Sequence, residues 1–272
     1  MKARIHFIAG LPRSGSTLLS ALLRQNPRFH AGVTSPLAML CGNLLHSMSG
    51  ATEFAPFFTD ERRAAMIRGI FDSYYGEIPE GQVVFDTNRT WTGKTALLGE
   101  IFPQARIICC VREVAWVIDS IEQLVRRNAL QPSKIFNYKN GSSIYSRVTT
   151  LMDSDSGIVG AAWNTLREAW FSESAKRLLV IQYETLVRQP QRVIERVYEE
   201  LDEPHFAHDF ANVRYEEPDY DAQLGAPGLH KVRPKVEFTA RETCLPPDLF
   251  AKYADVNFWA KPGLNKHKVT VL

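Results

Sequence analysis

The residues best suited to chemistry lie near the start of the chain, in the run Gly10–Thr17 (GLPRSGST). Its spacing is that of a phosphate-binding loop, G-x-x-x-x-G-K-[ST], with Ser16 in place of the lysine. Backbone N–H groups at the start of a helix can bind an anion without any side-chain charge. Arg13 supplies a cation, and the hydroxyls of Ser14, Ser16 and Thr17 can add donors. The run therefore predicts a site for a phosphate group.

The replaced lysine narrows the kind of phosphate that the loop could bind. In kinases and NTPases that lysine reaches the β- and γ-phosphates beside a bound magnesium ion. With Ser16 at this position, the loop predicts phosphate binding without γ-phosphate chemistry. A capped helix after a Gly-Pro turn would explain the same residues without a ligand, and the loop by itself leaves this alternative open.

A second candidate phosphate contact combines Arg112 with Ser120, eight residues later. Eight residues are slightly more than two helical turns, so a helix beginning at Glu113 places Ser120 near the face of its first turn. Arginine offers a fork of donors that suits phosphate oxygens. The pair could hold a second phosphate, although Arg112 could equally form a surface ion pair with Glu113.

The elements that must position these residues alternate between strand and helix. Strands are expected over Arg4–Ala9, Gln82–Asp86, Ala105–Val111 and Arg177–Gln182, and helices over Ser16–Gln25, Glu61–Tyr75, Trp91–Phe102, Val114–Asn128, Ile158–Ser174 and Gln191–Leu201. This order predicts an α/β fold with a central parallel sheet flanked by helices. Ligands of such sheets bind beyond the carboxyl ends of the strands. The following loops are expected to meet there: Gly10–Thr17, Asp86–Trp91, Arg112–Glu113 and Tyr183–Glu184.

The length of 272 residues fits one large domain with inserted segments, residues 1–272. Acceptor-binding or lid insertions are expected near 36–58 and 131–156, and a covering C-terminal segment near 225–240. These segments are less regular than the strands and helices between them.

The charge balance excludes a diffuse polyanion as partner. The formal net charge is +2, from 32 Lys and Arg against 30 Asp and Glu, which gives no reason to expect nucleic acid or a membrane surface. The four cysteines form no CxxC pair and are expected to be buried thiols, so no zinc site is predicted. No Asp and His residues cluster at the spacing of metal ligands, so no other metal site is predicted either. The sequence shows no signal peptide and no apolar run long enough to span a membrane, which predicts a cytoplasmic protein.

In combination these motifs resemble the sulfotransferases that use 3′-phosphoadenosine-5′-phosphosulfate (PAPS), in particular the tyrosylprotein and bacterial branch. The resemblance rests on PRSGSTLL after a strand, on the strand ending Val-Arg with a serine eight residues later, and on the strand ending Tyr-Glu-x-Leu. It spans Ile5–Leu186, with a weaker match at Gly228–Val236. It implies a three-layer P-loop NTPase-like fold and no required metal.

The resemblance also implies roles for individual residues. The 5′-phosphosulfate would be bound by Arg13, Ser14, Gly15, Ser16 and Thr17. The 3′-phosphate would be bound by Arg112 and Ser120, and Tyr183 would donate its hydroxyl to the cofactor. The segment that closes over the cofactor would include Leu229, His230 and Lys231.

The family's catalytic positions are only partly matched in this sequence. Arg89 follows the second strand where the family often has a lysine that touches the bridging oxygen. In the tyrosylprotein branch a glutamate acts as the general base, and this chain has Thr34 at that position. A threonine hydroxyl cannot act as a base. Asp86, at the end of the same strand as Arg89, is the preferred candidate for the base. His230 and His30 are the alternatives.

The expected reaction is in-line transfer of a sulfuryl group from PAPS, with PAP as product, to a hydroxyl of a small molecule, carbohydrate, lipid or peptide. Two other functions stay open at this point: a P-loop kinase with an altered loop, and a non-catalytic protein that binds PAP or another nucleotide. The sequence does not identify the acceptor or the oligomeric state.

Overall fold

The computed structural model describes residues 3–50, 52–128, 130 and 143–272. Six parallel strands form one sheet in the order β2-β3-β1-β4-β5-β6. The strands are β1 (Arg4–Gly10), β2 (Phe29–Ala31), β3 (Val83–Thr87), β4 (Ile107–Val111), β5 (Leu178–Gln182) and β6 (Thr270–Val271). The predicted α/β fold with a central parallel sheet flanked by helices is confirmed, and β2 and β6 are additional short strands.

Alternate residues of each central strand enter opposite hydrophobic cores, because successive side chains of a strand point to opposite faces. On β4, Ile107 and Cys109 belong to one core, whereas Ile108 and Cys110 belong to the other. This double burial explains why the strands are almost continuously apolar in sequence.

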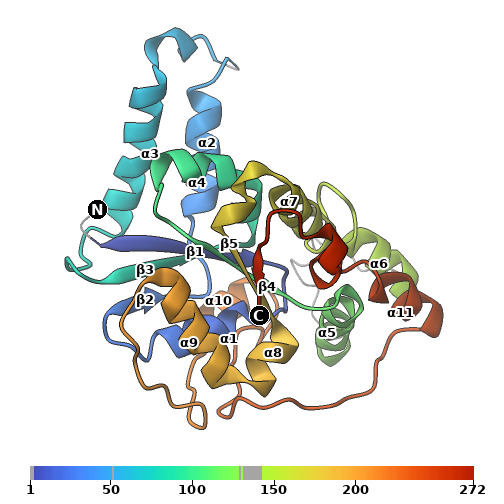
Figure 1. Ribbon diagram of the computed structural model, residues 1–272. Coiled ribbons are helices and arrows are strands. Elements are labelled where there is room, and N and C mark those ends of the chain that lie inside the picture. Colours follow the sequence, from blue (N-terminus) through green and yellow to red (C-terminus); the bar gives the residue numbers. More distant parts are fainter. Residues whose placement is uncertain (1–2, 51, 129, 131–142) are drawn as a thin grey trace.

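Helices cover both faces of the sheet (Figure 1). One face carries α1 (Ser16–Leu23), α8 (Tyr183–Arg188) and α9 (Pro190–Leu201). The other core is built with α2 (Leu37–Ser47), α3 (Asp60–Tyr74), α4 (Thr95–Ile101), α5 (Val114–Arg127), α6 (Ile144–Leu151), α7 (Gly160–Phe171) and α11 (Pro247–Ala254). The result is the three-layer arrangement that the resemblance implied.

Helix boundaries follow local signals. Thr59 accepts a hydrogen bond from the backbone N–H of Arg62 and so caps α3. The expected helix over Trp91–Phe102 is in fact a 3₁₀ segment, Arg89–Lys94, followed by α4. Asn88 caps the 3₁₀ segment and fixes its start directly after β3.

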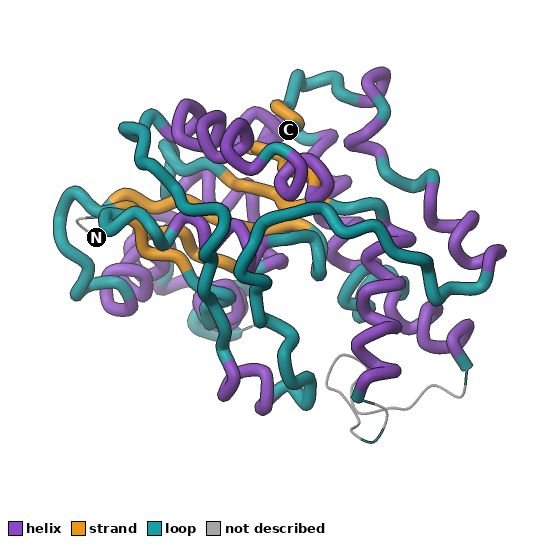
Figure 2. The backbone as a smooth tube through the Cα atoms, turned by 90° about the horizontal axis from the view of Figure 1, so that it is seen from below, coloured by secondary structure: helices purple, strands orange, loops and turns teal. Residues whose placement is uncertain are grey.

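The two predicted insertions and the predicted covering segment differ in form. Residues 36–58 contain α2 and a short 3₁₀ turn, and α2 projects with α3 away from the sheet (Figure 1). Residues 131–142 lie outside the described part, and the rest of 131–156 contains α6. Residues 225–240 follow α10 (Pro218–Gln223) as turns and irregular chain, without helix or strand. Figure 2 shows long loops of this kind crossing in front of the strands. Among the described residues, no helix has both the length and the apolar character needed to cross a membrane.

Candidate functional site

The loop Gly10–Thr17 makes a sharp turn from the end of β1 into α1. Gly10 has a φ of 105°, and a Cβ atom there would lie 2.1 Å from the carbonyl oxygen of Cys110 on β4. Gly15 has a φ of 92° and forms the N-cap of α1. No side chain in the described part of the chain caps this helix, and its first turn has no acidic residue. The first N–H groups of α1 are therefore available to an anion.

The hydroxyl groups of the loop differ in their surroundings. Ser14 is buried, and its Oγ donates to the carbonyl oxygen of Pro12 at 3.2 Å, within the loop itself. Ser16 and Thr17 lie half-buried in the first turn of α1, with no side-chain hydrogen bond to any described residue. Ser16 and Thr17 are thus better placed than Ser14 to donate to a ligand.

Arg13 joins three segments that the sequence analysis assigned to one ligand. Its Nε donates to Ser120 Oγ on α5 at 3.2 Å, and its Nη1 donates to the carbonyl oxygen of Leu229 at 2.5 Å. Residues 107 and 216 positions away along the chain therefore meet at the loop. Arg13 also has a φ of 57°, a conformation that costs a non-glycine residue energy.

The charge of Arg13 is not neutralised by an ion pair to any carboxylate among the described residues. Burial lowers the pKa of Arg13, and the nearby charge of Arg112 lowers it further, whereas Tyr183 and the Asp221 carboxylate raise it. Two guanidinium groups near each other in a partly buried site repel, and a bound anion would relieve that repulsion. The positive charge of Arg13 and Arg112 therefore favours the binding of a phosphate or sulfate group in this region.

Arg112 is held in place by two residues that follow β5. Its Nε donates to Glu184 Oε1 at 3.1 Å, and its guanidinium lies 4.3 Å from the centre of the Tyr183 ring. A Cβ atom on Gly15 would lie 3.0 Å from Cδ2 of Tyr183, so this ring also packs against the loop. Tyr183 thus links Arg112 to the loop.

Asp86, the preferred candidate for a base, is completely buried. It is 0% exposed, and its carboxylate oxygens accept hydrogen bonds from Tyr75 Oη at 2.7 Å and from Trp91 Nε1 at 2.6 Å. Burial raises the pKa of Asp86, and these hydrogen bonds partly offset the effect. In this position the carboxylate connects Tyr75, at the end of α3, to Trp91 of the 3₁₀ segment, and none of its surface is exposed. This placement does not favour the prediction that Asp86 is the base.

The other two candidates for the base lie in different places. His30 is exposed on β2 and pairs with Val84, within β3 rather than at its carboxyl end. His230 directly follows Leu229, the residue bonded to Arg13. Its Nδ1 lies 2.5 Å from Asp221 Oδ1, and Tyr220 packs against its ring with the centroids 5.4 Å apart. Of the two histidines, His230 is the one beside the loop.

Arg89 and Lys231 are both exposed. Arg89 begins the 3₁₀ segment after β3; partial burial lowers its pKa, and the nearby Tyr220 raises it slightly. Since Tyr220 also packs on His230, Arg89 lies in the same neighbourhood as the covering segment. Lys231 is 70% exposed and pairs with Glu216 at 3.4 Å, so its charge is directed to a surface carboxylate.

Asp221 is a functional candidate that the sequence analysis missed. It is 1% exposed, and both of its carboxylate oxygens contact His230. The two residues are nine positions apart, Asp221 in the short helix α10 and His230 in the turns after it, and neither strand nor helix spacing points to a contact. A buried aspartate beside a histidine becomes visible only when the turn between them is known.

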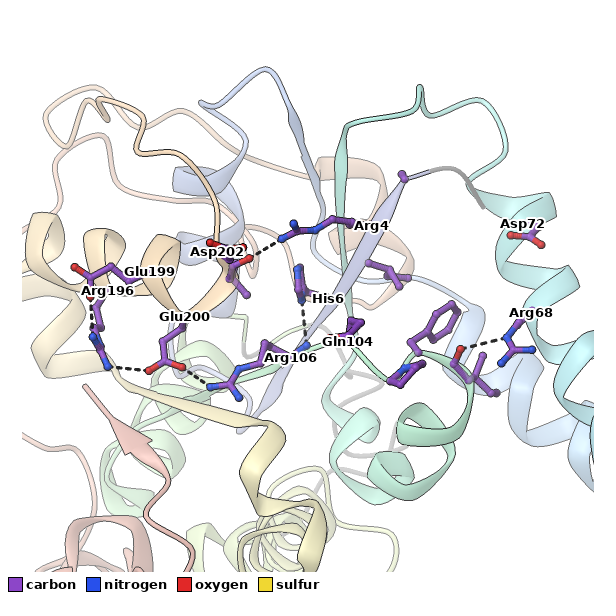
Figure 3. Close-up of a pocket in the computed structure, with 17 residues that line it drawn as sticks. Arg4, His6, Arg68, Asp72, Gln104, Arg106, Arg196, Glu199, Glu200 and Asp202 are labelled. Carbon is purple, nitrogen blue, oxygen red and sulfur yellow. Dashed lines mark hydrogen bonds and ion pairs between the residues drawn. The ribbon is translucent and has the colours of Figure 1, made fainter.

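A large cavity lies at the amino ends of the strands, opposite the loop (Figure 3). It has a volume of about 910 Å³ and is lined by the amino ends of β1 and β4 and by the end of α9. Its charged side chains pair with one another: Arg106 and Arg196 both contact Glu200. This cavity is separate from the loop, which lies beyond the carboxyl ends of the strands. In the part of the chain that the structure describes, no cluster of three or more His, Cys, Asp or Glu residues could hold a metal ion.

Comparison with known proteins agrees with this architecture. The model of the sulfotransferase family matches residues 6–208. A search of curated proteins finds no match. Among solved structures, the chain is similar to a sulfotransferase from Alicyclobacillus acidocaldarius, with 16% identity, a TM-score of 0.52, and coverage of 82% of this chain and 90% of the other.

A second similar structure is the sulfotransferase domain from the curacin biosynthetic pathway. It has 19% identity and a TM-score of 0.50, and 76% of each chain is covered. At these identities the structural matches show a shared fold only. The family match extends over β1, the Gly10–Thr17 loop, Arg112 and Tyr183, and on that basis the chain belongs to the sulfotransferase family.

Proposed function

We propose that the protein transfers a sulfuryl group from PAPS to the hydroxyl of an acceptor, with PAP as the second product. The observation that carries this proposal is the position of Arg13. It contacts Ser120 and Leu229 and lies near Arg112, without an ion pair to any described carboxylate. A ligand with phosphate groups at both ends of a ribose would suit such an arrangement of cations.

The two phosphate groups would bind at different parts of the site. The backbone N–H groups at the start of α1, with Ser16, Thr17 and Arg13, would hold the 5′-phosphosulfate. Arg112 and Ser120 would hold the 3′-phosphate. Tyr183 supports this placement by packing against both Arg112 and the loop.

The chemistry requires in-line positioning, stabilisation of the leaving phosphate and removal of one proton. PAPS supplies the activated sulfuryl group. Arg89 and the N–H groups of α1 would stabilise the negative charge that develops on the leaving 5′-phosphate. His230 would take the proton of the acceptor, and Asp86 would serve as a buried anchor for the segment that carries Arg89.

We further propose that the whole chain forms one domain, and that a small molecule, carbohydrate, lipid or peptide supplies the acceptor hydroxyl. The contact between Arg13 and Leu229 supports the first point, since it joins the late covering segment to the loop. A cytoplasmic location stays a prediction from the sequence.

The test is incubation with ³⁵S-labelled PAPS and a panel of hydroxyl acceptors, together with calorimetry of PAP binding. Transfer of label to an acceptor is the expected result. Tight PAP binding without transfer to any acceptor would instead favour a non-catalytic PAP-binding protein. Magnesium-dependent ATP binding that PAP cannot compete with would favour a kinase, and failure to bind either PAPS or PAP would refute the proposal.

A further inference from the structure

A single buried carboxylate holds His230 at two points. Asp221 Oδ2 accepts a hydrogen bond from the backbone N–H of His230 at 3.0 Å, and Asp221 Oδ1 lies 2.5 Å from the ring Nδ1. The side chain of Asp221 is 2% exposed, against 17% for that of His230. The aspartate therefore fixes both the backbone and the ring of the histidine, while part of the histidine stays accessible.

Asp221 is itself held by its surroundings. Its backbone N–H donates to the carbonyl oxygen of Glu217 at 2.9 Å, and its own carbonyl oxygen accepts from Ala226 at 3.0 Å. These two hydrogen bonds fix the backbone of Asp221 between helix α10 and the turn after it. The ring of Tyr220 packs on the imidazole and limits its rotation.

The segment is also joined to the phosphate-binding loop. Leu229, the residue before His230, accepts a hydrogen bond from Arg13. A ligand that orders Arg13 would therefore also order the chain next to the imidazole. Asp221 thus contacts the histidine directly, and the loop contacts the residue before it.

We propose that Asp221 is a positioning residue that keeps the ring proton of His230 on Nδ1 and leaves the lone pair of Nε2 free as the base. This inference rests on the proposed function. An ionised carboxylate can only accept hydrogen bonds, so the ring nitrogen that faces it must carry the proton. In the neutral ring the other nitrogen, Nε2, is then unprotonated.

The O–H bond of the acceptor breaks and its proton moves to Nε2 of His230. The acceptor oxygen forms a bond to sulfur, while the bond between sulfur and the 5′-phosphate oxygen breaks. That phosphate leaves with the electron pair as part of PAP. Asp221 stabilises the imidazolium that forms, without taking its proton.

The direct test is ¹⁵N NMR of the histidine rings in the full chain, with His230→Gln used to assign the signal. At a pH where the ring is neutral, we expect the proton on Nδ1. In Asp221→Asn the amide NH₂ can donate to the ring, and we expect the proton to move to Nε2. The matched control is Asp219→Asn, which removes the same charge from an exposed position on α10 and should leave the tautomer unchanged.

Reaction with diethyl pyrocarbonate gives a second readout that needs no acceptor. An unprotonated, accessible Nε2 should react at least tenfold faster in the unaltered protein than in Asp221→Asn, where the remaining lone pair lies on Nδ1 and faces the buried amide. A ring proton on Nε2 in the unaltered protein would overturn the proposal, and so would equal reactivity of His230 in the unaltered protein and in Asp221→Asn. If PAP does not bind at all, the proposed function fails, whereas the tautomer measurement still decides the role of Asp221.

Discussion

Replacing Arg112 with alanine tests the predicted 3′-phosphate site. Arg112 is held by Glu184 and by the Tyr183 ring, and its side chain is only 12% exposed. The loss of one charge-assisted hydrogen-bonded contact costs about 1.5–3 kcal/mol. At about 1.4 kcal/mol for each factor of ten, PAP should bind about 10- to 150-fold more weakly.

The assay is calorimetric titration with two ligands, PAP and adenosine 5′-phosphosulfate. The second ligand lacks the 3′-phosphate, so its affinity should change little in Arg112→Ala. Arg112→Lys keeps the charge but loses the fork of donors, so its affinity for PAP should lie between those of the unaltered protein and of Arg112→Ala. Arg196→Ala, at the opposite edge of the sheet, is the matched control and should leave both affinities unchanged. Equal losses for both ligands in Arg112→Ala would refute the assignment.

Three further predictions concern the reaction and the fold. Arg89→Ala should lower the transfer rate about 100-fold or more and leave PAP affinity almost unchanged; a collapse of PAP affinity with normal turnover of bound substrate would make Arg89 a binding residue instead. Gly10→Ala should lower the free energy of unfolding in urea by about 2–4 kcal/mol, because its Cβ would collide with the backbone of β4. Gly263→Ala is the control, since nothing lies near a Cβ at that position. Similar losses of stability in both variants would contradict the steric explanation. Burial and the charges of Arg4 and Arg106 lower the pKa of His6 to about 3, so between pH 7 and pH 5 the unfolded chain takes up a proton there that the folded chain does not. Stability should therefore fall by about 2 kcal/mol over this range, and His6→Gln should remove that part of the pH dependence; an equal pH dependence in both proteins would contradict it.

The sequence predicted the central sheet because its inner strands are buried on both faces. Runs such as Ala105–Val111 are apolar throughout, and the glycine and proline residues after β1 end that strand clearly. The edge strands β2 and β6 have only three and two residues. Pairing at such edges depends on the neighbouring strand rather than on a pattern in the strand itself, so neither was expected.

The candidate site was predictable to the extent that it depends on sheet topology. The carboxyl ends of parallel strands lie on the same side of the sheet. The loops that follow β1, β4 and β5 therefore bring Arg13, Arg112 and Tyr183 together as expected. The position of Asp86 was not predictable in the same way, since its contacts with Tyr75 and Trp91 depend on how α3 packs.

A crystal structure of the protein with PAP would test the central claim most directly. The account predicts the 5′-phosphate against the first N–H groups of α1 and Arg13, the 3′-phosphate against Arg112 and Ser120, and Nε2 of His230 facing the position of the transferred group. PAP bound elsewhere, for example in the cavity at the amino ends of β1 and β4, would contradict it.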